Sequence, residues 1–206
     1  SKNIALDIST NATVFEDRFR EIFKQFKHVE LLISIEATDE LYSVIRGGNY
    51  TWEDLNANIE KFYELPNLEV VFAVTVMTTN VFDLPNIWNW FNKYHKRRAS
   101  IAMSNVVVNP EYLNIAYLPE ELKVAAIEKI KDIPSRVLWP THSINAGASS
   151  HDYQTGIDDI INGLDREVDS DKQEKYWNYF LQYTRDLDRL RNTDTFALVE
   201  ELKGYK

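Results

Sequence analysis

Four apolar runs of strand length recur through the first half of the chain, separated by segments in which large apolar residues have helical spacing. The third run is almost continuously apolar, which is typical of a strand buried on both faces of a parallel sheet. Parallel neighbours need long crossover connections, and the intervening helices supply them. We therefore predict an α/β fold, either a partial (β/α) barrel or an open parallel sheet of about four βα units. The predicted strands are residues 4–8, 29–35, 70–76 and 101–108.

Polar residues before the apolar stripes predict where the helices begin. Thr13 and Glu16 have the spacing of a capping box, in which a hydroxyl and a carboxylate satisfy free amides at a helix start. Thr51 and Asp83 each precede a further apolar stripe and are predicted to be N-caps.

The second half of the chain is predicted to be mainly helical. Pro119 suits the first turn of a helix, and apolar stripes continue at residues 157–168 and 176–190. Residues 139–150 follow neither period and are predicted to form a loop. We expect both halves to pack as one compact unit, with a βα part at 1–118 and a helical extension at 119–206.

The composition excludes several classes of chemistry. The chain has 206 residues and no cysteine, so it cannot supply thiolates to an iron–sulfur cluster, a disulfide or a nucleophile. A net charge of −9 opposes binding to nucleic acid. No apolar run is long enough to span a bilayer and no export signal is visible, so we expect no membrane partner and a cytoplasmic location.

Polar residues gather at the ends of the second and third predicted strands. Ser34 and Glu36 end one strand, and Thr75 and Asn80 end the next. Arg46 lies between them and precedes two glycines. Because ligand sites of parallel α/β proteins lie at the carboxyl ends of strands, these residues are candidate ligand contacts. Structural roles stay open: a polar strand end, a helix C-cap at Arg46 and its glycines, and a turn cap at Asn80.

Two further clusters favour structural roles. His142, His151 and Asp152 could form a metal site, but their spacing matches no helical zinc motif. A cofactor-free hydrolase using the two histidines is a weaker alternative. The basic residues at 96–98 are typical of the last turn of a helix.

Several short motifs carry a family resemblance through their order along the chain. They are Thr10-Asn11, Ser34-Ile35-Glu36, the stretch 44–48 (Val-Ile-Arg-Gly-Gly), Thr75-Val76 with Asn80, and the stretch 187–191 (Leu-Asp-Arg-Leu-Arg). The first, second and fourth resemble the ends of the third, fourth and fifth strands in the barrel of a radical SAM enzyme with a short "twitch" extension, and the third resembles the family's Ile-Arg-x-Gly stretch. The last resembles a Leu-Asp-x-x-Arg segment of phage-type members. The resemblance covers residues 3–118.

The chain departs from the family pattern in important places. Members carry a Cys-x-x-x-Cys-x-x-Cys loop and a Gly-Gly-Glu motif, and both would precede Ser1. Position 12 is Ala where the family usually has Gly, and position 36 is Glu where it usually has Asp. The resemblance therefore implies the C-terminal portion of a longer enzyme, and we expect three closely spaced cysteines to be encoded upstream. A natural stand-alone remnant is the other explanation.

By resemblance, the cofactor is S-adenosylmethionine, and its expected contacts are Asn11, Ser34, Glu36, Arg46, Thr75 and Asn80. A [4Fe–4S] cluster would be held only by the full-length protein, so this chain alone is expected to be inactive. A peptide or protein is the expected substrate. The alternative is a non-catalytic half-barrel interaction module, whose exposed strand edges pair with a missing N-terminal half or with a second copy.

Overall fold

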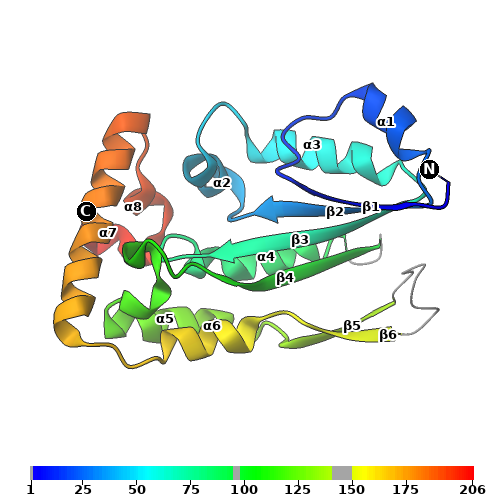
Figure 1. Cartoon of the computed structure of the whole chain (residues 1–206). Coiled ribbons are helices and arrows are strands. Elements are labelled where there is room, and N and C mark those ends of the chain that lie inside the picture. Colours follow the sequence, from blue (N-terminus) through cyan, green and yellow to red (C-terminus); the bar gives the residue numbers. More distant parts are fainter. Residues whose placement is uncertain (1, 95–97, 141–149) are drawn as a thin grey trace.

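The computed structural model describes residues 2–94, 98–140 and 150–206, and its centre is a four-stranded parallel sheet (Figure 1). The strands lie in chain order, β1-β2-β3-β4, and every neighbouring pair is parallel. The α/β prediction is confirmed. The strands are β1 (Ala5–Thr10), β2 (His28–Ile35), β3 (Leu68–Val76) and β4 (Ala99–Val106).

Helices between the strands cover one face of this sheet. The ring of Phe72 on β3 lies 4.7 Å from Trp90 and 6.0 Å from Phe91, between ring centroids. Trp52 continues this aromatic layer, 4.9 Å from Trp90. Strands in chain order with helices on one face resemble a segment of a (β/α) barrel, because doubly wound sheets reverse their strand order. The helices are α1 (Asp17–Phe23), α2 (Asp39–Arg46), α3 (Trp52–Tyr63) and α4 (Leu84–Phe91).

The other face of the sheet is only partly covered. Side chains of β2 and β3 alternate between buried and half-buried along each strand. The half-buried set, which we call the open face, has mostly polar or small side chains, with the apolar pair Leu32 and Val71 side by side in the strand register. The open face comprises the half-buried His28, Glu30, Leu32, Ser34, Glu69, Val71, Ala73 and Thr75, together with Asp7 of β1, which is exposed.

The two edges of the sheet differ. Met103 of β4 donates its backbone N–H to Thr155 O at 2.7 Å, and the adjacent Gly156 lies against Ser104 so closely that a Cβ would come within 2.5 Å of its backbone nitrogen. Within the described residues, β1 pairs only with β2. The outer edge of β1 is therefore the one available for pairing with another strand.

The C-terminal part is mainly helical, as predicted, but it also contains a strand pair. The loop predicted at 139–150 is wrong at its ends, because β5 (Arg136–Pro140) and β6 (Ser150–Gln154) form an antiparallel pair. The polar composition of β6 gave no apolar alternation to indicate a strand. The helices are α5 (Glu120–Ile130), α6 (Ile157–Leu164), α7 (Ser170–Arg191) and α8 (Thr195–Leu198), with 3-10 turns at Val81–Asp83, Glu111–Leu113, Ile115–Tyr117 and Glu200–Tyr205.

The predicted helix caps have mixed outcomes. Thr51 forms a capping box with Asp54, so that prediction is confirmed. The Thr13–Glu16 capping box is wrong, because the Thr13 hydroxyl donates to Asn11 Oδ1 at 2.9 Å and the helix begins at Asp17.

Asp83 precedes α4 but makes no side-chain cap bond. Its carboxylate instead accepts hydrogen bonds from the backbone N–H and hydroxyl of Thr38, at 2.7 and 3.1 Å. Asp83 therefore lies at the predicted N-cap position, but its side chain joins the loop after β2 to the loop after β3 and does not cap the helix. Pro119 lies directly before α5, one position earlier than the first helical residue.

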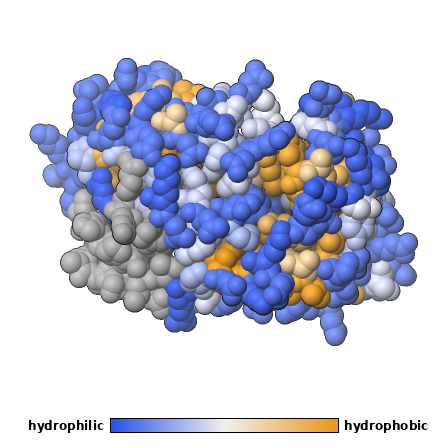
Figure 2. Space-filling model, turned by 180° about the vertical axis from the view of Figure 1, so that it is seen from behind, coloured by the Kyte–Doolittle hydropathy of each residue, from blue (hydrophilic) through white to orange (hydrophobic). Residues whose placement is uncertain are grey.

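Both parts of the chain contribute to one hydrophobic core, which includes Val76 and Ile87 from the first part and Leu122, Phe180 and Leu202 from the second. The surface seen in Figure 2 is mainly hydrophilic, with hydrophobic residues gathered in a few patches. Among the described residues, no helix combines the length and the apolar composition that crossing a membrane requires.

Candidate functional site at the carboxyl end of the sheet

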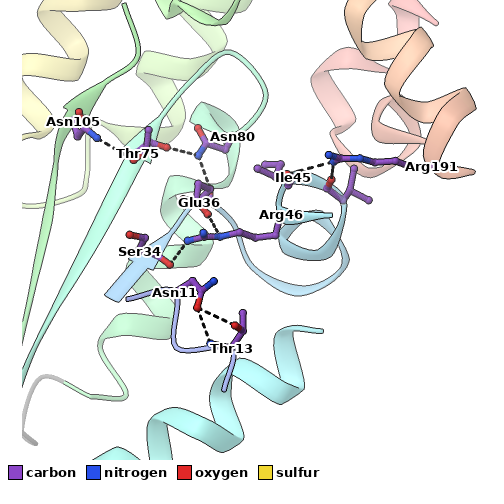
Figure 3. A network of polar contacts seen from close by, with 11 residues as sticks. Asn11, Thr13, Ser34, Glu36, Ile45, Arg46, Thr75, Asn80, Asn105 and Arg191 are labelled. Carbon is purple, nitrogen blue, oxygen red and sulfur yellow. Dashed lines mark hydrogen bonds and ion pairs between the residues drawn. The ribbon is translucent and has the colours of Figure 1, made fainter. Parts of the chain in front are cut away.

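An ion pair occupies the carboxyl end of β2. Glu36 follows the strand directly, and Arg46 is the last residue of α2, which turns back over the sheet edge (Figures 1 and 3). Arg46 Nε lies 2.5 Å from Glu36 Oε2, and Arg46 Nη2 donates to the backbone carbonyl of Ser34. The side chains are only 22% and 12% exposed, respectively. The structure therefore brings three predicted site residues together.

Burial governs the electrostatics of this pair. Desolvation raises the pKa of Glu36 above its usual value, and the positive charge of Arg46 opposes that rise. Glu36 Oε2 and Arg46 Nε contact each other and have no further hydrogen-bond partner in the described part of the chain. Each atom therefore depends on the other for its stabilisation in a partly desolvated place.

Tyr42 is a site residue that the sequence analysis missed. It lies one helical turn before Arg46 on α2, and the Arg46 guanidinium carbon lies 6.0 Å from the centre of its ring. The tyrosine is fully buried, and among the described residues its hydroxyl has no hydrogen-bond partner. Burial raises the pKa of Tyr42, Arg46 lowers it and Glu36 raises it further. An unpaired buried hydroxyl beside an ion pair is the arrangement that a polar ligand or a bound water would complete.

Asn80 joins the ends of two strands. Its amide Nδ2 donates to the backbone carbonyls of Glu36 and Thr75, and its Oδ1 accepts from the Met77 backbone N–H at 2.8 Å. The side chain is buried, and both of its amide hydrogens are used. These contacts match the turn-cap role that the sequence left open. Through them, Asn80 holds the ends of β2 and β3 together beside the site.

The remaining predicted residues lie at the border of the site. Thr75 Oγ1 accepts a hydrogen bond from Asn105 Nδ2 at 3.0 Å, across a register shift between β3 and β4. Asn11 accepts from the backbone and hydroxyl of Thr13 and is exposed. Figure 3 shows one connected network from Ser34 through Asn80 to Asn105, with the Asn11–Thr13 pair separate from it.

The turn after Arg46 is held from the other end of the chain. Gly47 has φ +67° and ends α2, so the predicted C-cap is confirmed in the backbone. The cation on the last carbonyls is Arg191, whose Nη1 donates to Val44 O at 2.7 Å. A Cβ at Gly47 would lie 2.9 Å from Arg191 Cζ. Arg46 is thereby left to face Glu36 on the opposite side of the turn (Figure 3).

Two predicted clusters fall on other parts of the chain. His142 lies outside the described residues, as do the side chains of His151 and Asp152, so the metal and hydrolase hypotheses stay predictions. In the basic cluster, Arg98 is described and donates to the backbone carbonyls of Leu65 and Pro66.

Neither a scan against protein-family models nor a search of curated proteins found a match to this chain. A functional assignment therefore rests on the geometry of the site and on the resemblance of the short motifs.

Proposed function

We propose that this chain is the C-terminal part of a radical SAM enzyme and that its strand ends form one wall of the S-adenosylmethionine pocket. The observation that supports this most is the buried hydroxyl of Tyr42, which has no hydrogen-bond partner among the described residues and lies beside the ion pair of Glu36 and Arg46 at the carboxyl edge of the sheet. Parallel sheets with strands in chain order bind their ligands at this edge. In a complete barrel, the open face would line the interior.

The residues of this chain suit S-adenosylmethionine but not an iron–sulfur cluster. The chain has no cysteine, so it cannot hold a [4Fe–4S] cluster by thiolates, and the proposal requires cluster ligands from outside it. The groups that would hold S-adenosylmethionine are present. Glu36 would accept from ribose hydroxyls, Arg46 would face a carboxylate, and the Tyr42 hydroxyl would donate to an acceptor on the ligand. A peptide or protein substrate and a cytoplasmic location belong to the same proposal.

A calorimetric titration with S-adenosylmethionine tests the proposal. We expect the wild-type chain to bind and Tyr42→Phe to weaken binding about tenfold, the equivalent of one hydrogen bond. The variant should be as stable as wild type or more stable, because it removes an unpaired buried hydroxyl. Tyr179→Phe makes the same chemical change at an exposed tyrosine and should bind like wild type.

Two outcomes would contradict the proposal. One is the absence of S-adenosylmethionine binding by the wild-type chain at millimolar ligand. The other is unchanged binding by Tyr42→Phe. The encoding reading frame upstream of Ser1 provides an independent check, since the enzymatic interpretation requires three closely spaced cysteines there.

A second candidate function is a half-barrel interaction module without catalysis. The specific observation in its favour is the outer edge of β1, which pairs with no other described strand, next to an open face that holds Leu32 and Val71. Partner strands added at β1 would extend the sheet and cover this apolar pair.

Light scattering at increasing concentration separates the two candidates. If a second copy covers the open face, the wild type should dimerise and Val71→Lys should shift it to monomer. Val124→Lys adds the same charge at a residue of α5 that is 65% exposed, and it should leave the dimer intact. A wild type that stays monomeric at every concentration would exclude self-association through this face.

A further inference from the structure

Three carboxylates stand in one row across the open face, far along the strands from the carboxyl-end site. Asp7 of β1 is in register with Glu30 of β2, which is in register with Glu69 of β3. Like charges directly opposite one another on neighbouring strands are destabilising. In the described part of the chain, no lysine or arginine forms an ion pair with any of the three.

A histidine completes this group. His28 begins β2, two residues before Glu30 and on the same face of the strand. Its Nε2 lies 3.6 Å from Glu69 Oε2, and the two side chains are only 12% and 20% exposed. One ligand atom each from His28, Glu30 and Glu69 lies within 4.8 Å of the others.

The arrangement of charge also favours a cation. Strand register places the carboxylates of Asp7 and Glu69 on either side of Glu30. The strands hold all four side chains on a hydrogen-bonded sheet, so bringing ligands together there requires little rearrangement.

We propose that His28, Glu30 and Glu69 bind a divalent transition-metal ion, with Asp7 adding negative charge beside it. One imidazole nitrogen with two carboxylates suits Zn²⁺ or a similar ion, whereas Mg²⁺ and Ca²⁺ prefer ligand sets made of oxygen alone. Bridging the row of carboxylates with a cation offsets their repulsion. The site lies at the amino ends of the strands and is independent of the proposed cofactor pocket.

The test begins with chelator-treated protein titrated with Zn²⁺, Mg²⁺ and Ca²⁺ in separate calorimetric experiments. We expect one Zn²⁺ to bind per chain. We also expect a higher midpoint of thermal unfolding with Zn²⁺, because an ion that binds only the folded state stabilises it. Equal or tighter binding of Mg²⁺ or Ca²⁺ would overturn the assignment to a transition metal.

Variants locate the ion on the chain. Removing a residue that only hydrogen-bonds a metal ligand typically weakens metal binding roughly 10- to 100-fold. His28→Gln and Glu69→Gln remove ligands themselves, so each should weaken Zn²⁺ binding by more than this. The matched control is the double variant His142→Ala/His151→Ala, which removes the other candidate ligands and should leave this binding unchanged. Loss of binding in the control, with retention in His28→Gln, would overturn the proposal.

A spectroscopic measurement keeps the proposal testable if a variant fails to fold. X-ray absorption at the zinc edge of the wild-type protein should show nitrogen and oxygen ligands, including one imidazole. A spectrum with two or more imidazoles would contradict the assignment, because only His28 among the proposed ligands has one. Circular dichroism of each metal-free variant separates loss of a ligand from loss of structure.

Discussion

The two ends of the sheet treat charge in opposite ways. At the carboxyl end, Glu36 has Arg46 as its partner, and Asn80 joins the backbone of the adjacent strand ends. At the amino end, the carboxylates of Glu30 and Glu69 stand side by side, with His28 as their nearby basic group. One end is held together by its own residues, whereas the other has negative charge that its described neighbours leave unbalanced. The folded state can tolerate repulsion between carboxylates at the amino end because contacts elsewhere, including those at the carboxyl end, stabilise the sheet.

The largest expected effect comes from breaking the carboxyl end at Asn80. Asn80→Ala leaves the carbonyls of Glu36 and Thr75 and the N–H of Met77 without these partners in a buried place. We expect a loss of about 3 kcal/mol in the free energy of unfolding, because unsatisfied buried groups retain their desolvation cost. Urea denaturation measures it, with the exposed Asn49→Ala as the control. Equal stability of the two variants would show that Asn80 does not hold the strand ends.

Removal of the positive charge should have the next largest effect. Arg46→Leu leaves Glu36 buried without its counter-charge, and we expect a loss of about 2 kcal/mol at pH 7, less than for a fully buried pair. The exposed pair of Arg18 and Glu16 supplies the control Arg18→Leu, which should cost about 0.5 kcal/mol or less.

The pH dependence of this loss has a definite sign. Burial raises the pKa of Glu36 in the folded state, and removing Arg46 raises it further, so the folded variant binds a proton more readily than the unfolded chain. The free energy of unfolding of Arg46→Leu therefore falls as the pH rises from 4.5, the ordinary pKa of the Glu36 carboxyl group, through the raised pKa of the folded state. Unfolding measured between pH 4 and 7 should show the deficit shrinking toward acid. A deficit that is constant with pH would contradict the pairing.

At the amino end, removing a charge should stabilise the fold, whereas at the carboxyl end it should destabilise it. Glu30→Gln removes one of three adjacent negative charges, and in metal-free protein we expect a gain of up to about 1 kcal/mol. The gain should shrink as salt screens the repulsion. Glu174→Gln, an exposed change on α7, serves as the control. Destabilisation by Glu30→Gln without metal would show that the row is not repulsive.

The smallest expected effect sharpens the description of the loop after β1. Ala12 is buried with φ +52°, a region that favours glycine. Ala12→Gly should relieve about 1 kcal/mol of strain but restore a similar entropy to the unfolded chain, so the net change should stay within about 0.5 kcal/mol. Thermal unfolding measures it. A gain above that range would mean that strain at this position dominates the balance.

The fold could be predicted because four short apolar runs alternate with segments of helical spacing, and the same pattern placed polar residues at the carboxyl ends of the second and third strands. Ser34 and Glu36 lie at the end of one strand, and Arg46 meets them because the helix that follows this strand ends beside it. Tyr42 could not be singled out, since a buried tyrosine in an amphipathic helix has the pattern of a core residue. Its importance lies in a hydroxyl without a partner among the described residues, which only the packing shows.

Contacts between distant residues were also beyond prediction. Asn80 had the local signature of a turn residue, and nothing in the sequence indicates that it also reaches the carbonyl of Glu36. The amino-end group arises from strand register, which places Glu30 beside Glu69 although 39 positions separate them. Register depends on the whole sheet, so such neighbours become visible only once all strands are assembled.

The turn at Gly47 depends on Arg191, a residue that is synthesised long after it. Its bond to Val44 O joins residues 147 positions apart. When a ribosome has made α2, the carbonyls that end this helix must rely on water until α7 has emerged. The turn that presents Arg46 to Glu36 is thus complete only when α7 is in place. Any ligand that needs this turn would meet its full site only on a chain whose later helices are already in place.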